Sequence, residues 1–175
     1  SIMANGTLKV QNIQTSSGSG TITLGQSGET IALGASSISG FGKVGQVVQS
    51  VIATTQNTTS TSYVTSNLSA SITPSTTSSK ILVILSGGNA WNNTNNANIV
   101  IAFYRDASNV ADAVGIIQNT SGTNSFKSSW SASYLDSPAS TSSLTYAPYY
   151  KVSSGTGHFN EATVSVQLTL MEILG

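Results

Sequence analysis

A tryptophan surrounded by amide side chains is the pattern in this sequence with the clearest potential for chemistry. It spans Trp91-Asn92-Asn93-Thr94-Asn95-Asn96. A flat indole face beside several amide donors and acceptors suits sugar recognition, so Trp91, Asn92, Asn93 and Asn95 are the candidate glycan-binding residues. The alternative is that Trp91 ends a strand and packs inward, leaving a polar turn. The sequence favours this second interpretation.

Catalysis and metal binding find little support in the residue types. His158 is the single histidine, and no G-x-S-x-G motif accompanies it. It lies in Gly155–Asn160, which we expect to form a hairpin turn. Asp106, Asn109 and Asp112 offer oxygen ligands, but their spacing misses the EF-hand pattern, which favours an ordinary surface turn. We therefore expect no enzyme activity, no bound metal and no cofactor.

A G-x-G-x-x-G match occurs at residues 40–45. A dinucleotide site needs a strand before this motif and a helix after it, so that backbone amides point at the pyrophosphate. Here a Ser-rich segment precedes the glycines and a Val-rich segment follows them. The sequence therefore predicts a flexible hinge between two parts of the chain.

Charge is scarce, which excludes several partners. Only 7% of the 175 residues are charged, against roughly 25% in an average soluble protein, and the six basic and six acidic residues cancel. The basic residues lie far apart, which argues against nucleic-acid binding. Cysteine is absent, no apolar run approaches a membrane span, and no signal-peptide pattern opens the chain. This composition suits a protein that packs against copies of itself on a particle assembled inside a cell and released by lysis.

A short repeat lies near the N-terminus. Residues 21–25 (TITLG) return nine positions later as residues 30–34 (TIALG). Each copy is too short to bury its own apolar side chains, and such units become stable by stacking or by pairing with other chains. We therefore predict a stem over residues 1–43 in which three chains share four buried side chains. These candidate stem contacts are Ile22, Leu24, Ile31 and Leu33.

Residues 44–175 have the pattern of a β domain. Roughly eight segments of apolar or alternating residues are divided by Ser, Thr, Asn and Gly, which predicts a β-sandwich or jelly-roll head. The run at residues 80–85 is apolar throughout and predicts a central strand covered on both faces. Trp130 lies in an alternating segment and is expected in the core. Residues 44–52 also have helical spacing, but their β-branched residues favour a strand lying against a neighbouring subunit.

Five segments spread over most of the chain carry a family resemblance. They are residues 42–49 (GKVGQVVQ), 71–83 (SITPSTTSSKILV), 133–138 (SYLDSP), 170–173 (LMEI) and 3–10 (MANGTLKV). With these segments the sequence resembles bacteriophage virion proteins that form fibre heads and small fibres. The resemblance implies a trimeric jelly-roll head, similar to the tumour-necrosis-factor and C1q type, on a short intertwined stem.

These observations together predict a homotrimeric structural protein on the surface of a phage virion. Its N-terminal segment would contact other virion proteins, and its head would bind a glycan on the host surface. One alternative is a capsid decoration protein without receptor binding, and another is a free bacterial lectin. Neither nucleic acid nor membrane insertion is expected in any of these functions.

Overall fold

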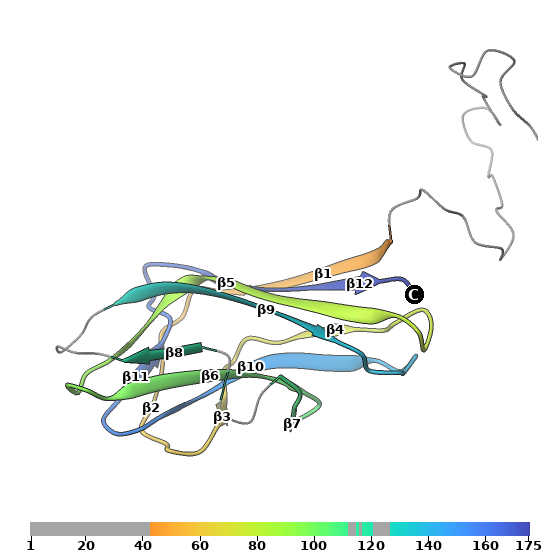
Figure 1. Ribbon diagram of the computed structural model, residues 1–175. Coiled ribbons are helices and arrows are strands. Elements are labelled where there is room, and N and C mark those ends of the chain that lie inside the picture. The colour runs from red at the N-terminus through yellow and green to blue at the C-terminus, as the bar shows by residue number, and fades with distance from the viewer. Residues whose placement is uncertain (1–42, 112–114, 116, 121–126) are drawn as a thin grey trace, which may run out of the picture. The chain divides into compact units, whose positions relative to one another are not determined.

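The computed structural model describes residues 43–111, 115, 117–120 and 127–175, and these residues form an all-β sandwich without helices (Figure 1). Two sheets face each other, and the chain crosses between them repeatedly. The first sheet, called sheet A, has the order β1-β12-β5-β11-β2, with β9 also paired to β5. Its strands are β1 (Val44–Ile52), β2 (Gln56–Thr58), β5 (Lys80–Asn92), β9 (Ser128–Asp136), β11 (Gly157–Phe159) and β12 (Val166–Ile173).

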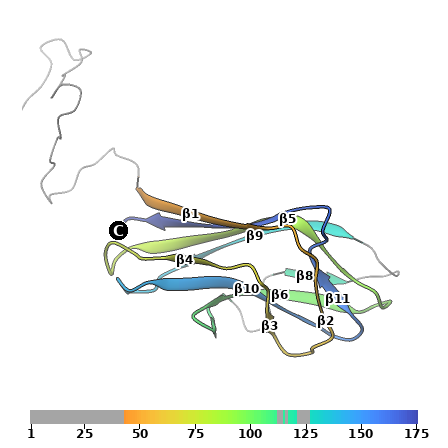
Figure 2. The same cartoon turned by 180° about the vertical axis from the view of Figure 1, so that it is seen from behind.

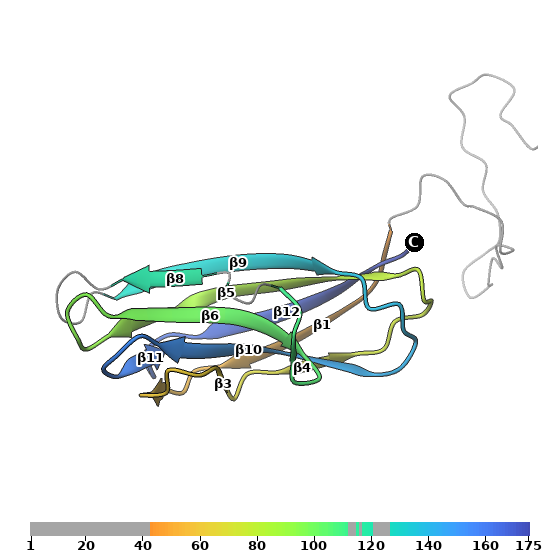
Figure 3. The same ribbon diagram turned by 60° about the horizontal axis from the view of Figure 1, so that its bottom comes forward.

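The second sheet, called sheet B, is built around two long antiparallel strands. β10 and β6 pair along most of their length; β3 and β4 pair with β10, while β7 and β8 pair with β6. Figures 2 and 3 show the same two layers from behind and from below. The strands of sheet B are β3 (Val64–Thr65), β4 (Ala70–Ile72), β6 (Asn98–Arg105), β7 (Ser108–Asn109), β8 (Ile117–Thr120) and β10 (Leu144–Val152).

Alternating side chains build the core between the sheets. Along β12, Val166, Leu168 and Leu170 are fully buried, while the residues between them are only partly buried. Because successive residues of a strand point to opposite faces, this pattern gives sheet A an inner face toward sheet B and an outer face away from it. Phe103 of β6 and Tyr146 of β10 are fully buried on the opposing sheet. The sequence prediction of a β-sandwich from residue 44 onward is confirmed at this level.

The first described strand resolves the ambiguous segment. Residues Val44–Ile52 form β1, an edge strand paired antiparallel with β12. Its alternate residues Val48 and Ile52 pack against the core, whereas Val47 and Val51 are exposed on the outer face. The expected strand is therefore confirmed, because β-branched residues fit a pleated edge better than a helix.

Two buried carboxylates fasten the sandwich. Glu172 of β12 accepts hydrogen bonds from the backbone N–H and the hydroxyl of Ser75, both at 2.6 Å, and from Nε2 of Gln46 at 2.8 Å. Asp136 of β9 forms an ion pair with Arg105 of β6 and accepts a hydrogen bond from the Tyr146 hydroxyl at 2.6 Å. Asp136 therefore links sheet A to sheet B, while Glu172 links β12 to β1 and to the loop after β4.

The structure also corrects some local predictions. Gly155–Asn160 was expected to be a hairpin turn, yet Gly157–Phe159 form β11, which pairs with both β5 and β2. Twelve strands occur in the described residues, rather than roughly eight. The additional strands have two or three residues each, so they are too short to show a sequence period.

Candidate functional site

A β-bulge in β5 decides where Trp91 points. Before the bulge, odd-numbered residues such as Leu85 face inward and are fully buried. Gly87 and Gly88 have positive φ angles of 80° and 67°, and the pairing of β5 with β9 gains one residue there. A bulge shifts the two-residue period by one position, so Ala90 turns inward and Trp91 turns to the outer face. The favoured prediction that Trp91 packs into the core is therefore wrong.

Trp91 lies within a ladder of side chains that crosses sheet A. His158 and Asn57 occupy the paired positions on β11 and β2. The imidazole of His158 stacks on the indole, with ring centroids 3.7 Å apart and planes within 3°. On the opposite side of β5, Nζ of Lys127 lies 5.4 Å from the indole centroid and forms an ion pair with Glu161. We call Lys127, Trp91, His158 and Asn57 the cross-strand ladder.

The charge states of His158 and Glu161 in the ladder follow from burial and from the nearby Lys127. Burial lowers the pKa of His158, and the nearby Lys127 lowers it further against the opposing effect of Glu161, so the imidazole is neutral at pH 7. The hydrogen bond from Lys127 lowers the pKa of Glu161, which keeps that carboxylate charged. His158 covers one face of the indole, and the Lys127 ammonium lies 5.4 Å from the indole centroid. A sugar that stacked on the face occupied by His158 would have to displace that ring.

The three asparagines predicted beside Trp91 have different environments. Asn92 is buried, its Nδ2 donates to the Ser154 carbonyl at 3.0 Å, and its Oδ1 accepts from the Thr94 N–H at 2.9 Å. Asn93 is exposed, but its Oδ1 accepts from the Thr156 N–H at 2.8 Å. Asn95 is exposed in the turn before β6. Asn92 therefore stabilises this turn, and Asn95 is the one of the three whose side chain makes no hydrogen bond to another described residue.

His158 and Asp106, which the sequence offered for catalysis or metal binding, make other contacts in the structure. Within the described residues, no group of three or more His, Cys, Asp or Glu could hold a metal ion. His158 is engaged in the stack, while Asp106 accepts a hydrogen bond from the Thr145 N–H at 2.9 Å. Asp112 lies outside the described residues. A search of the same part of the chain for a helix long and apolar enough to cross a membrane found none.

Part of the glycine motif and all four predicted stem contacts lie outside the described residues. Residues 40–42 lie outside the described residues, and the motif ends at Val44 and Gly45, which begin β1 rather than a helix. The dinucleotide geometry therefore does not form at its C-terminal end. The predicted stem contacts Ile22, Leu24, Ile31 and Leu33 also lie outside the described residues.

An apolar row crosses the other end of the outer face. Val47 pairs with Met171, Met171 with Leu82, and Leu82 with Leu135, so the four side chains lie side by side on β1, β12, β5 and β9. Val47 is 56% exposed and Leu135 is 47% exposed. Lys80 is the one charged residue among the outward positions of these strands. We call Val47, Met171, Leu82 and Leu135 the apolar row.

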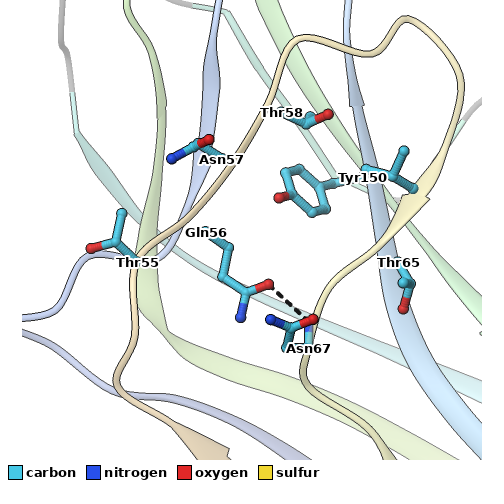
Figure 4. A pocket seen from close by; sticks show the side chains of 8 residues that line it. Thr55, Gln56, Asn57, Thr58, Thr65, Asn67 and Tyr150 are labelled. Atoms are coloured by element: carbon cyan, nitrogen blue, oxygen red, sulfur yellow. Dashed lines mark hydrogen bonds between the residues drawn. The ribbon is translucent and has the colours of Figure 1, made fainter.

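A polar pocket that the sequence did not reveal lies at one open side of the sandwich. It has a volume of about 470 Å³ and lies between the end strands of the two sheets, β2 and β3 (Figure 4). Figures 1 and 2 both show these strands near one another. Apart from Val64, the lining residues carry hydroxyl, amide or phenol groups, and none carries a formal charge. They are Thr55, Gln56, Asn57, Thr58, Val64, Thr65, Asn67 and Tyr150.

Comparisons with known proteins do not indicate a family for this chain. No protein-family model matches the chain, and a search of curated proteins found no significant match.

Proposed function

We propose that this chain is a non-enzymatic structural protein of a bacteriophage virion. Three copies form a fibre-like homotrimer of jelly-roll heads, and residues 1–43 attach the trimer to other virion proteins. The heads project from the particle surface and contact a glycan on the host.

The apolar row carries the proposal. Its residues extend across all four neighbouring strands, and the residues described for this chain leave them partly uncovered. Leu82 and Ile84 are the outward half of the apolar run in β5, whose inward half is fully buried. Large apolar patches on an outer face mark protein interaction sites. The apolar outward residues of β5 therefore support a contact between the outer face of sheet A and another protein chain.

A second copy of the same chain is the occupant that we propose. The row is almost uncharged, so it offers no charge pattern for a distinct partner to complement, whereas like apolar surfaces suit closed symmetric assembly. β1 forms one edge of this face, and the 42 residues before Lys43 lead directly into that strand. A stem that gathers three chains would therefore deliver three copies of β1 together. The repeated crossing between sheets is compatible with a jelly roll.

Two measurements test the proposal. Multi-angle light scattering of the purified full chain should give three times the chain mass of 17.9 kDa. Gold-labelled antibody against this chain should decorate intact phage particles under the electron microscope. A monomer at micromolar concentration would contradict the trimer, and unlabelled particles would contradict the virion location.

A capsid decoration protein without receptor binding is the second candidate. The ladder favours it, because His158 stacks on one face of the indole that the sequence offered as a sugar platform. Antibody labelling separates the two candidates by location, since a decoration protein would label the shell and a fibre would label an appendage. Loss of host binding after removal of the protein would favour the fibre.

A further inference from the structure

The polar pocket has a buried side chain at its centre whose hydrogen-bonding capacity is only half used. Gln56 of β2 is 7% exposed, and its Oε1 accepts a hydrogen bond from the Asn67 N–H at 2.8 Å. This contact, drawn in Figure 4, joins β2 to the segment after β3. Nε2 of Gln56 is buried and has no hydrogen-bond partner among the described residues. A buried amide donor without an acceptor is costly, so turning this amide toward a ligand acceptor in the pocket would be favourable.

Two further groups of the pocket are available for the same ligand. Tyr150 of β10 is 2% exposed, and its hydroxyl makes no hydrogen bond to another described residue. Its ring is held from behind by Phe159, with centroids 5.3 Å apart, and lies among the lining residues in Figure 4. The side-chain amide of Asn67 is exposed and likewise makes no hydrogen bond within the described structure. The lining thus includes one phenol hydroxyl and the side-chain amides of Gln56 and Asn67.

The chemistry of the lining limits the ligand. A formally charged ligand would lose hydration without gaining a counter-charge, because all the lining residues are neutral. A purely apolar ligand would leave the amides and hydroxyls unpaired. Sugar hydroxyls both donate and accept, as the amide and hydroxyl groups of this pocket do. The volume of about 470 Å³ falls within the range of small-molecule sites.

We propose that the pocket between β2 and β3 binds a neutral sugar residue, with Gln56, Asn67 and Tyr150 as its polar contacts. This inference rests on the glycan-binding part of the proposed function and is independent of the trimer. It moves the recognition site away from Trp91, one ring face of which is stacked on His158, to the opposite edge of β11. A single shallow site binds weakly, and an assembly that presents several copies would strengthen attachment through avidity.

Saturation-transfer NMR on the full chain tests the proposal, because this method detects weak ligands of large proteins. The probes are glucose, galactose, mannose and N-acetylglucosamine at millimolar concentration, each also presented as a linear oligosaccharide. Tyr150→Phe removes only the hydroxyl, and Asn67→Ala removes only an exposed amide. Each variant should weaken binding of the responding sugar by at least about fivefold, as expected for a lost hydrogen bond. Asn95→Ala, which removes an exposed amide in the turn near Trp91, is the matched control and should bind like the wild type.

The possible outcomes distinguish the site from the function. Binding by the wild type that survives in both Tyr150→Phe and Asn67→Ala would overturn the pocket while leaving glycan recognition intact. Loss of binding in Trp91→Ala, with both pocket variants unaffected, would return the site to the ladder. If the wild type gives no saturation transfer with any probe while intact phage still adsorbs to host cells through this chain, the neutral-sugar pocket is wrong. If the phage does not adsorb through this chain, the receptor function itself fails.

Discussion

The inner and outer faces of sheet A differ in how far their side chains are buried and paired within the subunit. On the inner face, side chains pack against sheet B, and the buried carboxylates of Glu172 and Asp136 have hydrogen-bond partners within the chain. On the outer face, His158 stacks on the indole of Trp91, but the apolar row is only partly covered by the described residues. The carboxylates of the inner face are thus paired within the subunit, whereas part of the apolar surface on the outer face is left uncovered. This difference is the ground for our proposal that the outer face contacts another subunit.

The inner face should be the most sensitive to mutation. Trp130 of β9 packs on the core edge-to-face with Phe159, at 5.1 Å between centroids. Trp130→Ala should lower the free energy of unfolding by about 3 kcal/mol, because it removes packed aromatic surface and leaves a cavity. Denaturant titration followed by circular dichroism measures the change at fixed protein concentration. Ser131→Ala, on the outer face of the same strand, is the control and should change stability by less than ~0.5 kcal/mol.

Glu172 should make the inner face sensitive to acid. Burial alone raises the pKa of this carboxyl, but the hydrogen bonds from Ser75 and Gln46 outweigh burial and lower the pKa to about 2. Because the pKa in the folded chain is below the ordinary value of 4.5, the carboxylate stabilises the fold above pH 4.5. That stability is lost as the pH falls toward 2. Glu172→Gln should cost about 2 kcal/mol at pH 7 by placing an amide donor against donors.

The acid dependence provides the check on this assignment. Stability of the wild type and of Glu172→Gln should converge between pH 4.5 and pH 2 in denaturant titrations at stepped pH. Parallel curves over that interval would show that Glu172 titrates normally in the folded chain, and the hydrogen bonds from Ser75 and Gln46 would then need revision.

The ladder on the outer face should contribute less. Trp91→Ala removes the stack on His158 and the contact with Lys127, which together are worth about 1–2 kcal/mol at a partly exposed site. The same variant should also raise the pKa of His158 toward its ordinary value of 6.5, since the ring becomes more hydrated. Denaturation gives the first quantity and NMR titration of the imidazole gives the second. An unchanged pKa would mean that other groups, not Trp91, keep this ring out of water.

Sequence patterns predicted the strands of the sandwich better than the position of Trp91 or the polar pocket. Period-two patterning indicated β9 and β12, because side chains of these strands alternate between the two faces, whereas β10 has three consecutive buried residues. Patterning could not place Trp91, because a two-residue period continued from Leu85 takes no account of the bulge at Gly87 and Gly88. Two adjacent glycines inside an otherwise apolar strand were the available signal for that bulge. The polar pocket had no local signal, since Gln56 and Tyr150 are far apart in sequence and are joined only by the approach of two sheet edges.

The smallest effect on the subunit and the largest on assembly should come from the apolar row. Leu135 is 47% exposed at the β9 end of the row, so Leu135→Asp should change the stability of the subunit itself by about 0.5 kcal/mol. A buried, unpaired carboxylate at a subunit contact is far more costly, and light scattering should therefore show single chains in place of trimers. Ser129→Asp places the same charge on the same face of the same strand, six residues away, and should remain trimeric. Trimers of both variants would show that the row stays exposed in the assembly, whereas single chains of both would extend the contact along the whole of β9. The subunit contact is assigned to the apolar row only if Leu135→Asp dissociates while Ser129→Asp remains trimeric. Both variants must also keep the circular dichroism spectrum of the wild type.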